Sequence, residues 1–357
     1  MQIKAEALAG HLNRGRFERL YCVSGDEPLL AEEAMDTLRT TARAAGFTER
    51  EVLHTSAKFD WSLLTNAANS LSLFAVRKII EIRLPGGKPG RDGGDALRRH
   101  AESANDDVLT LVVLPRLDRT ARNSAWATAL ETNGAWIEVR RVERSQLPAW
   151  LRARLARQKQ TASTETLEFL ADRIEGNLLA AQQEIAKLAL LYPAGELTHE
   201  QVAEAVQDVA RFEVFDLPTV MLSGETQRAV RMLNVLRAEG AALPLVLWAI
   251  TEEVRAVLRA QQVIAAGRPV ATLAREMRMW PGRDRLLEMA AVRVPAAAAA
   301  TLLTRCADID RLSKGLRVPT RDTDPWLELA EVVLDVASTR RNQTEPSANR
   351  ETRLQTA

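Results

Sequence analysis

The sequence predicts an α/β domain in the first 141 residues, followed by two all-α domains. Short apolar segments of strand character alternate with amphipathic helical segments up to this point, and beyond Val142 only the helical pattern continues. Alternating strands and helices predict a mostly parallel sheet with helices on both faces. A chain of 357 residues is also too long for one ordinary core. The expected division is 1–141, 142–211 and 212–338, with a polar, disordered tail at 339–357.

Five short apolar segments define the expected sheet. The first, Leu-Tyr-Cys-Val-Ser, is followed by a glycine turn and by Pro28, which is typical of an early helical position. The expected strands cover residues 20–24, 51–55, 78–84, 108–114 and 135–140.

The rest of the chain has the helical period. The middle domain is expected to contain helices at 147–158, 163–174, 178–191 and 198–206. The last domain is expected to contain helices at 228–239, 243–265, 284–291, 296–312 and 324–337.

Composition excludes several classes of protein. Forty-eight basic and forty-seven acidic residues give a net charge of +1, so no field of the whole molecule draws it to nucleic acid or to a membrane. No run of eighteen apolar residues is present, and a cytoplasmic protein without a membrane partner is expected. Cys22 and Cys306 are far apart and the four histidines are scattered, which predicts buried free thiols and no metal site.

The strand and glycine turn that precede Pro28 are where a phosphate-binding loop would be expected. Such a loop needs Gly-x-x-x-x-Gly-Lys-Ser/Thr, yet Gly25 is followed by Asp26 and Glu27, whose charges repel phosphate. The glycine-dense residues 86–94 are expected to form a flexible surface loop. No nucleophile elbow or cysteine signature is present either. The sequence thus predicts no catalytic residue, no nucleotide site and no cofactor.

Residues 70–76, Ser-Leu-Ser-Leu-Phe-Ala-Val, lie where a helical pattern changes to a strand pattern. Phe74 continues the apolar stripe of the preceding helix and Leu73 lies off it, so one helix face cannot bury both. Local pattern leaves two interpretations open. The two side chains pack beneath the neighbouring strand, or at least one is exposed as an anchor for a partner.

Five motifs occur in an order that resembles the delta-subunit family of the bacterial DNA polymerase III clamp loader, which is of the AAA+ class. The motifs are Gly-Asp-Glu-Pro-Leu-Leu from residue 25, Ser-Leu-Phe-Ala from 72, Leu-Pro-Arg-Leu-Asp from 114, Glu-Gly-Asn-Leu-Leu-Ala from 175 and Asp-Ile-Asp-Arg-Leu-Ser-Lys-Gly from 308. The resemblance implies an AAA+-like first domain with a degenerate nucleotide site, because delta subunits do not bind ATP and neighbouring subunits do. It covers the chain up to about residue 337.

The resemblance also implies the partners. Leu71, Leu73 and Phe74 would enter an apolar pocket of the ring-shaped sliding clamp (beta) and favour the opened ring for loading onto primed DNA. Delta prime and gamma/tau subunits would complete a hetero-oligomeric ring, with the helical domain 212–338 in its collar. Primer–template DNA would thread that ring.

Basic residues near the end of the helix at 296–312 are the DNA-contact candidates. Arg311, Lys314 and Arg317 recur at three-residue spacing, and Arg321 follows Pro319. These residues suit phosphate contacts or a solvated helix face, and both interpretations stay open. The same alternatives, with subunit contact as a third, apply to the arginines at 140, 141, 144, 152, 154 and 157.

The expected function is that of an accessory subunit of a DNA-directed DNA polymerase holoenzyme, without an active site of its own. Two alternatives remain: an active AAA+ ATPase of similar architecture, and a helical scaffold protein unrelated to replication. Magnesium-dependent ATP binding would favour the first, and failure to retain the sliding clamp would favour the second.

Overall fold

A computed structural model describes residues 1–13, 17–69, 77–103, 105–207, 209–277, 279 and 282–338. The chain forms two compact units, which are described separately. The first consists of residues 1–172 and 178–207, and the second of residues 173–177 and the described residues from 209 onward.

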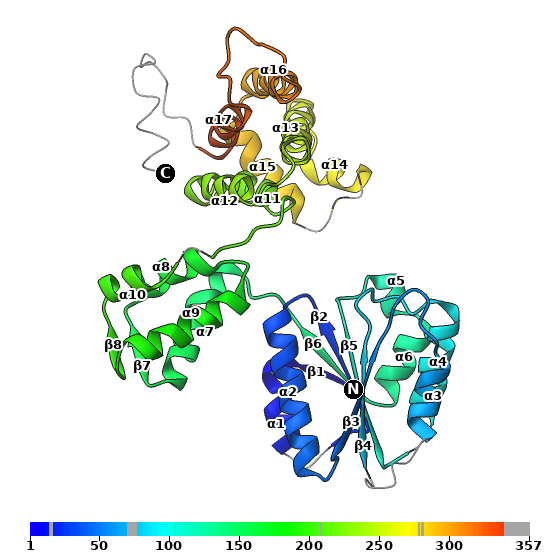
Figure 1. The fold of residues 1–357 in the computed structure, drawn as a ribbon. Coiled ribbons are helices and arrows are strands. Elements are labelled where there is room, and N and C mark those ends of the chain that lie inside the picture. The colour runs from blue at the N-terminus through cyan, green and yellow to red at the C-terminus, as the bar shows by residue number, and fades with distance from the viewer. Residues whose placement is uncertain are drawn as a thin grey trace. The chain divides into compact units, whose positions relative to one another are not determined.

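The first unit contains a six-stranded parallel sheet in the order β1-β6-β2-β5-β4-β3 (Figure 1). The five expected strands are confirmed. The sequence pattern missed β1, whose three residues are too few for a periodic signal, and which pairs in register with β6. The strands are β1 (Gln2–Lys4), β2 (Leu20–Gly25), β3 (Glu49–His54), β4 (Lys78–Arg83), β5 (Val108–Leu114) and β6 (Ala135–Val139).

Helices cover both faces of this sheet, as the alternating pattern predicted (Figure 1). Alternate side chains of β2 enter opposite cores: Tyr21 and Val23 pack beside α1 and α2, whereas Leu20 and Cys22 pack beside α3, α4 and α6. Cys22 is buried as a free thiol, and so is Cys306 in the second unit. The helices are α1 (Leu8–Asn13), α2 (Pro28–Ala44), α3 (Ser62–Asn69), α4 (Gly90–Glu102), α5 (Arg119–Arg122) and α6 (Ala125–Thr132).

The glycine-rich residues 86–94 are not wholly a loop, which corrects the expectation. Helix α4 begins at Gly90 and includes Gly93 and Gly94. A Cβ atom on Gly93 would lie 2.4 Å from the indole ring of Trp61, and one on Gly94 would lie 3.2 Å from Trp126. These glycines therefore allow the tryptophan rings to pack closely against the backbone of α4. Composition alone could not show whether the glycines form a flexible loop or a tightly packed helix.

Four longer helices in the rest of the first unit confirm the expected helical pattern: α7 (Leu147–Arg157), α8 (Thr164–Ile174), α9 (Leu178–Leu191) and α10 (His199–Ala205). The expectation that strands end after Val142 is wrong in one detail. Strands β7 (Gln160–Ala162) and β8 (Gly195–Leu197) form a parallel pair. Gln160 of β7 is buried, and its side-chain amide donates hydrogen bonds to the carbonyls of Leu188, Tyr192 and Pro193 at and just after the end of α9. These bonds hold β7 beside the turn that leads into β8.

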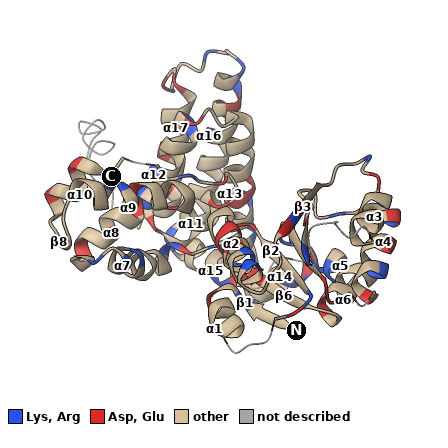
Figure 2. Ribbon diagram, turned by 60° about the horizontal axis from the view of Figure 1, so that its bottom comes forward, with Lys and Arg blue, Asp and Glu red and all other residues tan. Residues whose placement is uncertain are grey.

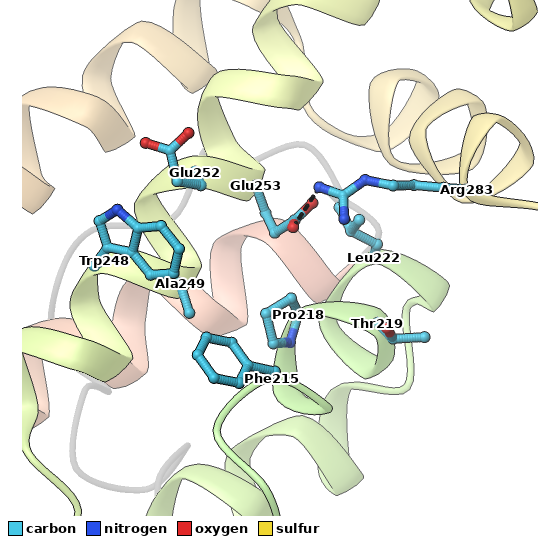
Figure 3. Close-up of a pocket in the computed structure, with 9 residues that line it drawn as sticks. All are labelled: Phe215, Pro218, Thr219, Leu222, Trp248, Ala249, Glu252, Glu253 and Arg283. Carbon is cyan, nitrogen blue, oxygen red and sulfur yellow. Dashed lines mark hydrogen bonds and ion pairs between the residues drawn. The ribbon is translucent and has the colours of Figure 1, made fainter. Parts of the chain in front are cut away.

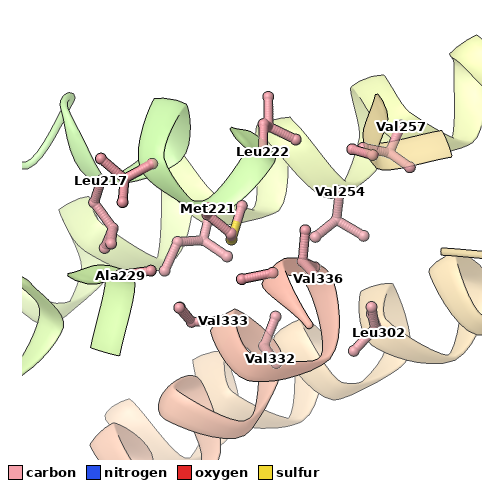
Figure 4. Close-up of a cluster of buried hydrophobic side chains, with 14 of the residues drawn as sticks. Leu217, Met221, Leu222, Ala229, Val254, Val257, Leu302, Val332, Val333 and Val336 are labelled. Carbon is pink, nitrogen blue, oxygen red and sulfur yellow. The ribbon is translucent and has the colours of Figure 1, made fainter. Parts of the chain in front are cut away.

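The described part of the second unit is helical and has one apolar core, part of which Figure 4 shows. Met221 from α11, Val254 from α13 and Val333 from α17 meet in it. Long helices are confirmed; the seven-residue helices α11 and α14 were missed because each is too short to show a period. The helices are α11 (Leu217–Ser223), α12 (Thr226–Ala238), α13 (Leu243–Ala265), α14 (Val270–Glu276), α15 (Arg283–Arg293), α16 (Ala296–Ser313) and α17 (Pro325–Ala337).

In the described ranges no single helix is long and apolar enough to cross a membrane. Helices α15 and α16 reach the required length and composition only as a pair, which is bent by 99°. Both helices contribute buried side chains to the core of the second unit.

The packing of Trp61 on Gly93 leads to a test of stability. A Gly93→Ala substitution should lower the free energy of unfolding by about 1–3 kcal/mol, because the added methyl group collides with the indole ring. Urea denaturation measures this change. Gly10→Ala is the matched control at an exposed position of α1, where nothing lies within 4 Å of the added atom. It should be neutral or stabilising by up to about 1 kcal/mol, and equal effects of the two substitutions would contradict the packing argument.

Candidate interaction sites

The expected clamp-binding residues Leu71, Leu73 and Phe74 lie outside the described residues. The structure does describe both flanks of residues 70–76. Helix α3 ends at Asn69 before this segment, and β4 begins at Lys78 after it. The segment therefore connects a helix on one face of the sheet with a strand inside the sheet.

Buried aromatic and apolar contacts hold the helix before the segment. Leu64 and Ala67 of α3 are buried, as the sequence stripe predicted. Trp61 packs edge-to-face on Phe59 with ring centroids 5.1 Å apart, and both rings lie against the same core. Leu64 and Ala67 thus hold α3 on the core beside the sheet, and the contact of Trp61 with Gly93 holds the start of α3 against α4.

A buried ion cluster holds the strand after the segment. Glu81 in the middle of β4 is fully buried and accepts hydrogen bonds from Arg39, Arg50 and Arg83. Burial raises the pKa of Glu81, but the hydrogen bonds from Arg39 and Arg83 and the charges of Arg39 and Arg50 outweigh it, so the pKa is lowered overall. The cluster ties β4 to α2 through Arg39 and to β3 through Arg50. Spacing could not reveal this cluster, since Arg39 and Arg50 lie far from Glu81 in the chain and only Arg83 is close to it.

A small polar cavity of about 180 Å³ adjoins the end of α3. Ala68, Asn69 and His100 line it, and the His100 Nε2 atom lies 2.7 Å from the Thr110 hydroxyl. Burial lowers the pKa of His100 to about 4. His100 is therefore neutral near pH 7 and serves as a hydrogen-bonded part of the wall.

The turn at the carboxyl end of β2 is where a related fold would bind nucleotide. Only Asp26 and Glu27 separate β2 from α2, whereas a phosphate-binding loop needs four residues between its glycines alone. Gly25 is a strand residue paired with Val139 of β6, and a Cβ atom on it would lie 2.0 Å from the Val139 carbonyl oxygen. This glycine therefore allows close strand pairing and does not wrap a ligand.

Acidic side chains fill the same turn. An Asp26 carboxylate oxygen accepts a hydrogen bond from the Arg116 amide at 2.9 Å. Glu27 is buried, and its burial raises the pKa of the carboxyl group, which the Leu29 amide and the charge of Arg141 partly offset. The first turn of α2 thus has carboxyl groups beside it, and Pro28 contributes no amide donor.

The DNA-contact candidates lie at and beyond the end of α16. Arg311 is 63% exposed with Asp308 at 3.6 Å, and Lys314 is 64% exposed with Asp310 at 2.6 Å. Arg317 is exposed and has no ionic partner among the described residues. Because exposed ion pairs are weak, these three charges remain available to a polyanion. Figure 2 shows that acidic and basic residues are interspersed along the surface helices.

Other arginines of the chain have internal roles. Arg321 pairs with Asp308 at 3.0 Å and approaches buried Glu328, so it ties the chain after α16 to α17. Arg144 pairs with Asp172 at 2.6 Å. Arg154 is buried and forms a bidentate ion pair with the carboxylate of Glu33. Structural ion pairs thus account for several of the basic residues that spacing alone left open.

Among the described residues no group of three histidine, cysteine, aspartate or glutamate side chains is arranged to hold a metal ion.

Comparison with known proteins identifies the family. A family model described as DNA polymerase III, delta subunit, matches residues 21–140. The chain is 30% identical over 308 residues to DNA polymerase III subunit delta of Escherichia coli K12, which covers 85% of this chain and 89% of that protein. It is 26% identical over 350 residues to the same subunit of Haemophilus influenzae. This match covers 94% of this chain and 99% of that protein.

A solved structure, the DNA clamp loader delta protein of Bacillus subtilis, aligns with 93% of this chain and 99% of its own, with a TM-score of 0.49 and 18% identity. On the strength of the sequence match, the chain belongs to the DNA polymerase III delta-subunit family. It is thus a clamp-loader subunit, an accessory subunit of the polymerase holoenzyme in DNA replication.

The lowered pKa of His100 predicts a loss of stability in acid. An unfolded histidine has a pKa near 6.5 and that of folded His100 is about 4, so the unfolded chain binds the extra proton between these values. This contribution to stability is complete above pH 6.5 and falls as the pH approaches 4, by up to about 3 kcal/mol.

Urea denaturation at several pH values measures this loss. A His100→Gln variant should show a shallower decline between pH 6.5 and 4 than the wild type. A His54→Gln variant removes an exposed imidazole from β3 and should keep the wild-type decline. The same slope in all three proteins would contradict the role of His100.

Proposed function

We propose that this subunit binds the sliding clamp through Leu71, Leu73 and Phe74 and stabilises the opened ring for loading onto primed DNA. The match to the Escherichia coli delta subunit over 85% of the chain carries this proposal. The anchored flanks of residues 70–76 support it, because a short apolar segment held at both ends can be presented to a partner at little entropic cost. A few such side chains can supply most of the energy of an interface.

Ring opening follows from differential binding. A subunit that binds the open clamp more tightly than the closed clamp shifts the equilibrium toward the open form by the difference in binding free energy. This mechanism requires no chemistry in the subunit itself. The two-residue acidic turn between β2 and α2 supports the further proposal that this chain does not bind ATP and that ATP-binding subunits of the complex control access to its clamp-binding segment.

The three-domain division 1–141, 142–211 and 212–338 is proposed on the same basis. The first domain carries the clamp-binding segment, the second is the small helical lid, and the third joins the delta prime and gamma/tau subunits in a collar. The single apolar core of the second unit supports a separately folded collar domain.

The clamp-binding proposal predicts a large effect of removing two side chains. A Leu73→Ala, Phe74→Ala double variant should lose about 3 kcal/mol or more of binding free energy for the clamp of its own cell, since each buried apolar side chain contributes roughly 1.5–3 kcal/mol. Surface plasmon resonance measures the affinity, and circular dichroism checks the fold. Leu63→Ala, an exposed leucine of α3, is the matched control and should bind like the wild type. Unchanged affinity in the double variant would contradict the proposal.

We also propose that Arg311, Lys314 and Arg317 contact the phosphates of primer–template DNA when the subunit is part of the loader. Their exposure and weak local pairing support this role, while nearby Asp308 and Asp310 make the patch only slightly basic. The contacts would position the DNA and carry no sequence preference.

The DNA proposal predicts a change in salt dependence. A Lys314→Gln, Arg317→Gln variant of the assembled loader should bind DNA more weakly, and the slope of log K against log salt should fall by roughly 0.9 per lost duplex contact. Fluorescence anisotropy at several salt concentrations gives the slope. Arg268→Gln, which removes an exposed arginine paired with Glu276, is the control. Identical slopes in all three loaders would exclude these residues as phosphate contacts.

A further inference from the structure

Arg77 is the first described residue after residues 70–76, and it directly precedes β4. Lys78, the first residue of β4, pairs with Glu49 of β3 on one side and with Val108 of β5 on the other. Because these strands are parallel, the chain segments that enter β3 and β5 lie on either side of the start of β4. Arg77 is therefore placed to contact both segments.

The connection from α2 to β3 holds Arg77 on one side. The Nη1 atom of Arg77 donates a hydrogen bond to the carbonyl oxygen of Ala45 at 3.1 Å. Ala45 caps the carboxyl end of α2, where the last carbonyl groups lack partners within the helix and carry the negative end of its dipole. The backbone carbonyl of Arg77 also accepts a hydrogen bond from the Thr48 amide at 3.3 Å. A cation at this position thus satisfies a helix end as well as joining the two segments.

An aromatic ring supports the same guanidinium group. The central carbon of the Arg77 guanidinium lies over the Phe47 ring, 5.5 Å from its centroid. Phe47 is buried in the core beside α1 and α2, and its ring centroid lies 5.9 Å from that of Phe17. The Phe17 ring in turn lies 5.7 Å from Tyr21 of β2. The ring beneath Arg77 is therefore fixed by the core of the first unit.

The connection from α4 to β5 holds Arg77 on the other side. The Asp107 carbonyl oxygen accepts a hydrogen bond from the Lys78 amide at 2.9 Å, and the Asp107 carboxylate lies 3.6 Å from the Nε atom of Arg77. The Asp107 amide donates to the side-chain oxygen of Asn105 at 3.0 Å. Different nitrogen atoms of one guanidinium group thus face the two connections. The single nitrogen of a lysine could not reproduce both contacts together with the one to the ring face.

These contacts act locally. The Arg77 side chain is 44% exposed, and exposed ion pairs contribute little to the stability of a whole domain. They do restrict the residue at which residues 70–76 join the sheet. Their expected effect is therefore on how the neighbouring segment is presented to a partner.

We propose that Arg77 is a positioning residue for clamp binding, because its guanidinium group fixes the carboxyl end of residues 70–76 between the two connections. Arg77 acts through the segment and makes no contact with the clamp. When a binding segment adopts its competent conformation only part of the time, the apparent affinity falls by that fraction. This inference rests on the proposed binding of the clamp through Leu71, Leu73 and Phe74.

Binding kinetics of the full-length subunit test this role. In surface plasmon resonance with the clamp of the same cell, Arg77→Gln and Arg77→Lys should each lower the association rate constant about five-fold, because the competent fraction falls. The dissociation rate constant should stay the same, since no contact with the clamp is lost. Arg98→Gln is the matched control and should bind like the wild type. The Arg98 side chain in α4 is also 44% exposed and lies 3.8 Å from Asp95.

The Arg77→Lys variant separates position from charge. If it binds like the wild type while Arg77→Gln binds more weakly, the charge alone acts and the inference is overturned. Faster dissociation of either variant would also overturn it, because Arg77 would then contact the clamp itself. Urea denaturation completes the test: lower stability with an unchanged association rate constant would leave only a structural role and would likewise overturn the inference.

The Leu73→Ala, Phe74→Ala double variant separates this inference from the proposed function. If the wild type does not bind the clamp, or if the double variant binds as tightly as the wild type, the proposed function is wrong and the inference falls with it. If the double variant loses binding and both Arg77 variants bind like the wild type, the proposed function stands and the positioning role of Arg77 is excluded.

Discussion

The indole ring of Trp61 packs on the bare backbone of Gly93, and this contact holds the start of α3 against α4, which packs on the same core. The helix ends immediately before the proposed clamp-binding segment, so its placement determines where that segment starts. The Glu81 cluster has the same effect on β4, where the segment ends. Apolar packing and buried ion pairs thus act together to fix both flanks of seven residues that are proposed to meet a partner.

The turn between β2 and α2 supports the proposal that this chain does not bind ATP. A parallel sheet presents the carboxyl ends of its strands at one edge, which is where ligands bind in folds of this class. Here the turn at that edge is reduced to two acidic residues, and Gly25 is used for strand pairing. In the proposed function, such a subunit contributes binding free energy, and its partners supply the nucleotide chemistry.

Periodic patterns predicted the sheet and the long helices because each rests on local alternation of apolar and polar residues. Short elements such as β1, β7 and α11 carry too few residues for a period, and they form because neighbouring elements supply their partners. The glycines of α4 were misjudged because their role depends on tryptophans distant in sequence. The same limit applies to the basic residues: spacing could not separate Arg321, which is held by Asp308, from Arg317, which is exposed.

The candidate site residues also differ in how far the sequence alone could reveal them. The motif at 72–75 was recognisable only by resemblance to a family, since its local pattern allowed both burial and exposure and favoured burial. The cavity of about 410 Å³ beside Trp248 could not be predicted from the sequence, because Phe215 before α11 and residues of α11, α13 and α15 line it together (Figure 3). Packing brings these residues together, and packing is the information that a single sequence lacks.

The central claim is that residues 70–76 contact the sliding clamp. Hydrogen–deuterium exchange of the full-length subunit, with and without the clamp of its own cell, tests it most directly. Amides of residues 70–76 should become protected when the clamp is added, while those of residues 86–88 should exchange as before. Protection elsewhere in the chain, with residues 70–76 unchanged, would contradict it.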